Sequence, residues 1–190
     1  MKIILDLKQL KIYFYTFIFL MANFYLIKKL GKYIKSGDKV LDLGCGKGIL
    51  AYLIKEKLKA EVIGVDIRNV CETNIPFVLY DGKNLPFTDK SFDVILIAYV
   101  LHHAQNPQEI LKEAKRVCKN TIIILEDTPS NFIHQVSCYF HGLIFNKLAN
   151  LHWRSSFKSK AEWLQLFRML NLEIISLNEN KVFNPLHYTK

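Results

Sequence analysis

The sequence contains few cysteines, and no two of them are closely spaced. The four thiols are Cys45, Cys71, Cys118 and Cys138, and no C-x-x-C pair occurs among them. This distribution argues against a disulfide framework and against a thiolate zinc site, and it fits a reducing compartment. We therefore expect no bound metal and a cytoplasmic location.

Internal repeats, low-complexity tracts and flexible linkers are also absent from the sequence. The chain has 190 residues, of which 51% are hydrophobic, so it is too apolar to be disordered and long enough for one full core. We predict a single domain over residues 1–190. Its expected parts are a hydrophobic and basic helical extension (1–35), a ligand-binding core (36–127), an aromatic segment (128–156) and a C-terminal helix with strands (157–190).

Acidic residues are scarce relative to basic ones. The chain has 17 Asp and Glu against 26 Lys and Arg, which gives a net charge of +9. The basic excess lies in residues 1–39 and 128–190, whereas residues 40–127 are close to neutral. A basic surface attracts anionic lipid, nucleic acid or acidic substrates. Lysine used only for solubility explains the same excess, so the charge alone selects no partner.

Charge is missing altogether from residues 12–27, which are rich in aromatic side chains and flanked by lysines. A helix of this length spans about 24 Å, short of the roughly 30 Å hydrocarbon core of a bilayer. Three interpretations stay open: a lid packed on the domain, a helix in a membrane interface, or a short signal anchor. The second would give peripheral membrane contact through residues 8–35 at the cytoplasmic face.

The most informative pattern that is present is a strand, a glycine turn and a helix. Val40–Leu43 is typical of a buried strand, and Ile49–Lys59 has helical spacing of its apolar residues. Between them, glycine occupies alternate positions: Gly44, Gly46 and Gly48. Glycine lacks a Cβ and adopts positive φ, so a ligand can approach such a backbone closely, and the helix start adds free N–H groups.

An acidic residue follows this turn at an informative distance. Asp66 ends a second hydrophobic run, Glu61–Asp66, where a nucleotide-binding α/β fold places the carboxylate that binds ribose. A nicotinamide-dependent oxidoreductase is one alternative that this acid suits. However, the turn reads G-x-G-x-G rather than the G-x-G-x-x-G of dinucleotide binders, which disfavours that alternative.

The stretch from Val40 to Gly48, with Asp42 before the first glycine, resembles motif I of the class I S-adenosylmethionine (SAM)-dependent methyltransferases. Asp81–Phe87 is similar to the Asp-Ala/Gly-x-x-Leu-Pro-Phe segment of that family, and Phe92–His103 is similar to its fourth strand and the histidines after it. The resemblance covers residues 38–127 firmly and 157–190 loosely. It is to the small-molecule group that includes quinone-biosynthesis enzymes.

This resemblance implies an α/β fold with a doubly wound, Rossmann-like sheet. Seven mostly parallel strands are expected, the last two forming an antiparallel pair at Leu172–Leu177 and Leu186–Thr189. Only Ile67–Ile75 separates the second and third strands, so the crossover is too short for the helix that usually fills it. Asn171 follows the expected helix over 158–169 and, because Asn tolerates left-handed φ, it is a candidate C-cap.

The resemblance also implies SAM as cofactor. The implied cofactor-binding residues are Asp42, Gly44, Cys45, Gly46, Gly48, Asp66, Ile67, Asp81, Gly82, Ala98 and Tyr99. Of these, Asp66 would bind the ribose hydroxyls and Asp81 the adenine amino group, while Ala98 and Tyr99 would close the pocket beneath the sulfonium.

The expected reaction is methyl transfer to a small, apolar O, N or C nucleophile. A hydroxyl acceptor needs a general base. We predict His103, Glu126 and Asp127 as catalytic candidates, with His102 and His152 as further histidines to consider. Packing or capping is the ordinary role of a histidine after a strand. A non-catalytic methyltransferase-like protein at a membrane surface remains an alternative. The motif Asn-Pro-Pro-Tyr is absent, so nucleic acid is not an expected substrate.

Overall fold

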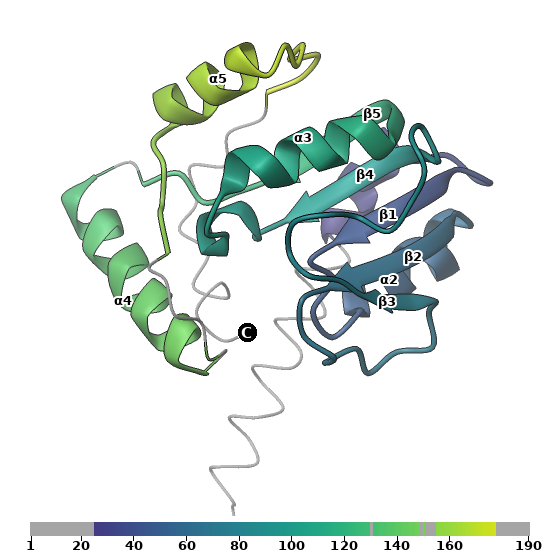
Figure 1. Ribbon diagram of the computed structural model, residues 1–190, viewed down its shortest axis with the longest axis horizontal. Helices are drawn as coiled ribbons and strands as arrows, with labels where there is room; N and C mark the ends of the chain where they lie inside the picture. The colour runs from purple at the N-terminus through teal and green to yellow at the C-terminus, as the bar shows by residue number, and fades with distance from the viewer. Residues whose placement is uncertain (1–24, 130, 149, 151–154, 178–190) are drawn as a thin grey trace, which may run out of the picture.

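The computed structural model describes residues 25–129, 131–148, 150 and 155–177, which form a five-stranded sheet with helices around it (Figure 1). The strands are β1 (Lys39–Leu43), β2 (Glu61–Asp66), β3 (Phe77–Leu79), β4 (Phe92–Ala98) and β5 (Cys118–Leu125). All pairings are parallel, in the order β3-β2-β1-β4-β5. The strand order reverses between β1 and β4, and open α/β sheets bind ligands at such a switch point.

Helical segments connect and flank these strands. They are α2 (Ile49–Leu53) with a π-helical turn η1 (Ile54–Leu58), the 3-10 turn η2 (Leu101–His103), α3 (Pro107–Val117), α4 (Phe132–Leu148) and α5 (Lys160–Met169). The helix expected over 49–59 is therefore confirmed as α2 and η1 together. Residues 25–30 are also helical.

The sheet is buried on both faces, as a parallel sheet must be. Successive side chains of a strand point to opposite faces. Accordingly, Leu41 and Ile95 belong to the hydrophobic cluster under α3 and α5, while Val40 and Leu96 belong to the cluster that contains residues of α2, η1 and residues 27–34. Figure 1 shows α3 along the sheet with α5 beyond it, and α4 standing to one side. The doubly wound architecture is confirmed.

The hydrophobic extension expected at residues 1–35 is described only from residue 25 onward. In this part Ile27, Leu30 and Ile34 are buried in the core. The described end of the extension thus packs on the domain. Residues 12–24, which carry the three interpretations of the uncharged segment, lie outside the described residues.

The short crossover between β2 and β3 is confirmed, since residues 67–76 contain no helix. Buried Ile75 and the neighbouring Thr73 pack directly onto the backbone of Gly48 and Gly64, where an added Cβ would collide with their side chains. The Thr73 hydroxyl also donates a hydrogen bond to the Gly48 carbonyl at 3.0 Å. This link therefore covers the part of the sheet face that a crossover helix would otherwise cover.

The C-terminal end differs from the expected strand pair. Residues 172–177 are irregular rather than a strand, and residues 186–189 lie outside the described residues, so the described sheet has five strands instead of seven. The Leu172 N–H bonds to the Phe167 carbonyl at 2.9 Å and not to a strand, because Asn171, at φ 51°, closes α5 with a left-handed cap. Asn171 thus has the left-handed conformation that was expected, although the C-cap residue itself is the preceding Leu170.

Candidate active site

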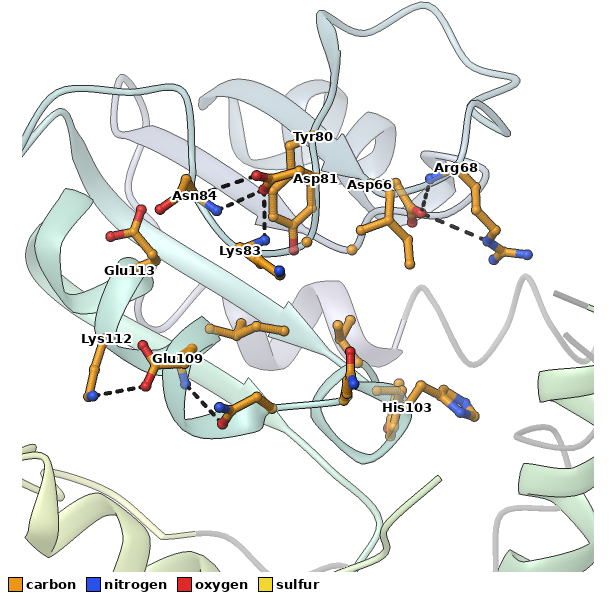
Figure 2. A pocket seen from close by; sticks show the side chains of 18 residues that line it. Asp66, Arg68, Tyr80, Asp81, Lys83, Asn84, His103, Glu109, Lys112 and Glu113 are labelled. Carbon is orange, nitrogen blue, oxygen red and sulfur yellow. Dashed lines mark hydrogen bonds and ion pairs between the residues drawn. The ribbon is translucent and has the colours of Figure 1, made fainter. Parts of the chain in front are cut away.

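A cleft opens at the carboxyl ends of the strands, where the sheet order reverses. Its volume is about 950 Å³, near the upper end of the range for small-molecule sites. Figure 2 shows side chains converging on it from the segments after β2 and β3 on one side and from the segment after β4 and α3 on the other. The place is the one that the switch-point rule predicts.

The glycine turn after β1 borders this cleft with bare backbone. The amides of Gly44 and Cys45 donate to the Val65 carbonyl at 2.8 and 3.0 Å, which ties the turn to β2. Gly44 has φ 79°, and a Cβ there would collide with Val100. Gly46 has φ 53°, but apart from its own residue and its two chain neighbours no atom lies within 4 Å of the position its Cβ would take. The two glycines thus serve different needs: close packing at Gly44 and open space at Gly46.

Asp66 is held rigidly at the end of β2. Asp66 is only 7% exposed, and its carboxylate accepts hydrogen bonds from the Gly46 and Arg68 amides, both at 2.9 Å. These two bonds use about half of the roughly four acceptor positions of a carboxylate. The Arg68 guanidinium also forms an ion pair with Oδ1, at 3.9 Å. Asp66 lines the cleft (Figure 2), and the acceptor positions that these contacts leave suit the hydroxyl groups of a ligand.

Asp81 organises the loop after β3. Its Oδ1 accepts hydrogen bonds from the Lys83 and Asn84 amides, each at 2.8 Å, and these bonds lower the pKa of the carboxyl. Burial, with the nearby Asp66 and Asp81 carboxylates, raises the pKa of Tyr80 to about 12. The loop therefore offers the cleft an ionised carboxylate next to a neutral phenol.

Tyr99, the first residue after β4, has a backbone conformation that is unusual for a bulky side chain. Its φ is 58°, in the left-handed region, and its amide donates to the Leu125 carbonyl at 2.8 Å. Such conformations cost of order 1–3 kcal/mol and cluster at functional sites. Burial, assisted by the nearby Asp127 and Glu126, raises the pKa of its phenol, which stays neutral.

Glu126 turns into the protein rather than into the cleft. One carboxylate oxygen accepts the amides of Val100 and Leu101 at 3.0 and 2.6 Å, and the other lies 2.5 Å from Nδ1 of His102. Its side chain is 4% exposed. Glu126 therefore fastens the loop after β4 to the end of β5, and its catalytic role stays a prediction.

Asp127 is also absent from the residues that line the cleft. Its pKa is raised, chiefly by burial, and the neighbouring Glu126 adds to the shift while His102 and His134 oppose it.

His103 is the catalytic candidate that lines the cleft. Its Nδ1 lies 2.9 Å from the Ser155 hydroxyl, in the segment after α4. The preceding His102 is buried and stacks on Phe157, with ring centroids 4.4 Å apart. The two adjacent histidines thus have different surroundings, one in the core and one at the cleft.

The structure brings half of the predicted site residues to the cleft surface. These are Gly44, Asp66, Ile67, Asp81, Gly82, Tyr99 and His103. The predicted residues that are not among its lining are Asp42, Cys45, Gly46, Gly48, Ala98, Glu126 and Asp127. His152 lies outside the described residues.

Three of the predicted residues that do not line the cleft pack inside the protein instead. Asp42 is buried within β1. The Cys45 thiol packs against Gly64, and burial, with Asp42 and Asp66 nearby, raises its pKa. Gly48 packs against the short crossover.

Sequence reasoning missed several residues of the cleft. They are Arg68, Tyr80, Lys83, Asn84, Val100, Gln105, Asn106, Glu109, Ile110, Lys112 and Glu113. Those next to a predicted position could have been found by extending each strand end by one or two residues. Those on α3 come from the packing of that helix, for which no local motif exists.

Helix α4 has an apolar surface close to the His103 side of the site. Its exposed large apolar side chains are Phe132, Ile133, Val136, Tyr139, Phe140, Leu143 and Ile144. Within the described ranges, no helix is long and apolar enough to cross a membrane. The same part of the chain contains no group of three or more His, Cys, Asp or Glu side chains placed to hold a metal ion.

The chain is similar to known methyltransferases. A family model described as a methyltransferase domain matches residues 21–177. A demethylmenaquinone methyltransferase of Thermotoga maritima is 36% identical over 104 residues, which cover 50% of this chain and 45% of that protein. A chloroplastic 2-phytyl-1,4-beta-naphthoquinone methyltransferase of Arabidopsis thaliana is 30% identical, with 60% and 50% covered. The chain spans about half the length of these curated relatives.

Among solved structures, the YcgJ protein from Bacillus subtilis superposes with a TM-score of 0.62. The two sequences are 21% identical, and the match covers 78% of this chain and 67% of the other. At this identity the likeness shows the fold alone.

Proposed function

Because the chain belongs to the methyltransferase-domain family, we propose that it transfers a methyl group from SAM to a small lipophilic acceptor. The observation that carries the proposal is the Asp66 carboxylate, fixed between the Gly46 and Arg68 amides at the edge of the cleft. A carboxylate in this position binds the hydroxyl pair of a ribose, and its distance from the glycine turn suits a nucleoside ligand.

The residues of the cleft fit SAM. Asp66 would hold the ribose, Asp81 the adenine amino group, and the backbone at Gly44 and Gly46 would border the methionine part. Ile67 and the neutral ring of Tyr80 offer an apolar environment for a base. When bound, SAM supplies a methyl group on a positively charged sulfur that leaves as a neutral thioether.

Since that leaving group is good, the protein mainly has to orient the reactants and exclude water. We assign the floor of the site to Tyr99, whose strained backbone turns the chain at the end of β4. Glu126 fixes the loop that follows, through its bonds to Val100 and Leu101. It therefore acts as a positioning residue in this proposal. His103 is the general base, because it lines the cleft whereas Glu126 and Asp127 do not.

Two observations support a lipophilic acceptor. The names of the relatives refer to methyltransferases of quinones with apolar chains. In addition, α4, whose exposed face is apolar, is linked to the His103 side of the cleft through Ser155.

Titration calorimetry with SAM and with its demethylated product S-adenosylhomocysteine tests the cofactor assignment. The wild type is expected to bind both, and Asp66→Ala to bind each at least tenfold more weakly, about 1.4 kcal/mol or more. Glu72→Ala is the control, because Glu72 forms an exposed ion pair with Lys47 away from the cleft. Binding of NADH in place of SAM would instead support the oxidoreductase alternative.

The apolar face of α4 favours a second candidate function, namely a methyltransferase-like protein that acts at a membrane surface. Peripheral contact would involve α4 together with the lysine-rich residues 8–35, of which 8–24 lie outside the described residues. Flotation with anionic phospholipid vesicles tests it. The double variant Phe132→Ser and Ile133→Ser is expected to reduce binding without loss of stability, because these side chains are 77% and 80% exposed. Vesicle binding with no methyl transfer to any lipid-extract fraction would favour this second candidate as the sole function.

A further inference from the structure

We propose that Ser155 and Asn146 hold His103 in the tautomer that carries its proton on Nδ1, so that Nε2 is the basic atom of the site. The catalytic role of this tautomer rests on the proposed methyl transfer, whereas the tautomer itself does not. It makes Ser155 and Asn146 positioning residues for the base.

A chain of hydrogen bonds connects three separate parts of the protein at this point. His103 comes from η2, Asn146 from the last turns of α4, and Ser155 from the segment that follows α4. The Ser155 hydroxyl lies 2.9 Å from Nδ1 of His103 and donates to Oδ1 of Asn146, also at 2.9 Å. Asn146 is 8% exposed, so the far end of this chain of bonds is anchored in a buried side chain.

The tautomer follows from counting protons. A serine hydroxyl has one hydrogen to donate, and Ser155 uses it on Asn146. Toward His103 the hydroxyl can then only accept, so Nδ1 must carry the hydrogen. A neutral imidazole has a single N–H, which leaves Nε2 with its lone pair. His103 lines the cleft and lies at its edge in Figure 2, where an acceptor bound in the cleft can reach it.

The neighbouring His102 shows why His103 is the one suited to this task. Nδ1 of His102 meets the carboxylate of Glu126, and its ring is buried against Phe157. The group at Nδ1 of His103 is instead the neutral Ser155 hydroxyl, which sets the position of the proton without adding a charge. In the reaction the acceptor's O–H or N–H bond breaks, its proton forms a bond to Nε2, and the imidazolium later releases that proton to water.

A glycine keeps the chain of bonds together. Gly142 is buried in α4, and a Cβ there would lie 2.8 Å from Cβ of Ser155. Gly142 therefore allows the segment that contains Ser155 to pack closely against α4. A methyl group at position 142 is expected to push Ser155 away from His103, although it removes no hydrogen-bonding group itself.

The tautomer can be measured directly by two-bond ¹H–¹⁵N NMR on the full chain labelled with ¹⁵N-histidine. The signals of His103 are identified as those lost in His103→Gln. In the wild type, Nδ1 is expected to show the shift of a protonated nitrogen and Nε2 that of an unprotonated one. Ser155→Ala and Gly142→Ala should move the population toward the Nε2–H form. Ser155→Thr keeps the hydroxyl and should restore the wild-type pattern. Ser156→Ala, at an exposed neighbouring serine, is the matched control.

The kinetic prediction is a fall in kcat on Ser155→Ala of about tenfold or more, with rescue by Ser155→Thr and less than about twofold change in KM for SAM. An Nε2–H tautomer in the wild type would overturn the proposal, as would an unchanged tautomer in Ser155→Ala. The NMR result requires neither cofactor nor acceptor. If the protein fails to bind SAM, the proposed function is wrong, and the NMR measurement still decides the tautomer independently. If SAM binds and His103→Gln transfers methyl groups at the wild-type rate, only the role of the base is lost.

Discussion

The two sides of the cleft are built in different ways. On the side of β2 and β3, the carboxylates that line the cleft lie within a few residues of a strand end, namely Asp66 after β2 and Asp81 after β3. On the other side, the groups come from distant parts of the chain: Glu126 reaches back to Val100, and Asn146 reaches His103 through Ser155. The carboxylates of the first side are placed by the ends of their own strands, whereas the groups of the second side are placed by contacts with distant residues.

Removal of the carboxylate that holds each loop, Glu126 for the loop after β4 and Glu113 for the loop after β3, should have the largest effect. Glu126→Ala leaves the amides of Val100 and Leu101 without their acceptor and breaks the contact with His102. We expect a loss of about 3 kcal/mol in the free energy of unfolding. Glu113 has a similar task beside β3, where it accepts the Leu85 amide and pairs with Arg116. Its side chain is 21% exposed and holds one backbone amide, so Glu113→Ala should cost only about 1 kcal/mol.

Urea unfolding of both variants measures these costs. Equal losses would mean that the loop after β4 is no more dependent on its carboxylate than the loop after β3. Loss of activity in Glu126→Gln at wild-type stability would return Glu126 to the role of a base, which the sequence alone suggested.

This contrast explains which parts of the site could be predicted from the sequence. Gly44, Asp66 and Asp81 were found because their spacing from a hydrophobic strand is itself the signal. Glu126 was identified because it follows β5. The direction of its side chain could not be predicted, because its hydrogen-bond partners lie 24 to 26 residues away in the sequence. The chain of hydrogen bonds from Asn146 to His103 could not be predicted from the sequence, because no sequence motif contains both residues.

The same reasoning applies to the fold. The parallel strands and their order follow from hydrophobic runs and the right-handed crossover rule. Residues 172–177 have an apolar run that is typical of a strand, but a strand forms only where it pairs with a neighbouring strand. Here the first amide, that of Leu172, bonds to the Phe167 carbonyl at the end of α5 instead.

The glycine turn offers a prediction of intermediate size that compares two neighbouring positions. Gly44→Ala and Gly46→Ala both place a Cβ at positive φ, which costs roughly 1 kcal/mol. Only at Gly44 does this Cβ also collide with Val100, so thermal unfolding should show the larger fall in Tm for Gly44→Ala. At Gly46 the Cβ points into open space, so SAM affinity should fall further than stability does. Equal Tm values would contradict the packing role of Gly44.

The smallest expected effects concern two aspartates whose pKa values shift in opposite directions, Asp81 after β3 and Asp127 after β5. The pKa of Asp81 is lowered by the Asn84 and Lys83 amides, so its carboxylate adds stability that is lost as the pH falls below its ordinary value of 3.8. The pKa of Asp127 is raised by burial. The folded protein therefore holds the proton of Asp127 more tightly than the unfolded chain does, and stability decreases as the pH rises from 3.8 through the raised pKa.

Replacement by asparagine removes each titration. Asp81→Asn should be less stable than the wild type near neutral pH, with the difference shrinking in acid. Asp127→Asn should equal the wild type in acid and exceed its stability near neutral pH. Urea midpoints measured across the acid range check both signs. If stability shifted in the same direction in both variants, the contrast between an exposed carboxylate after β3 and a buried carboxylate after β5 would be wrong. If the signs are opposite, Asp127 is a carboxylate that the fold holds at a cost in stability, as is typical of groups retained for function.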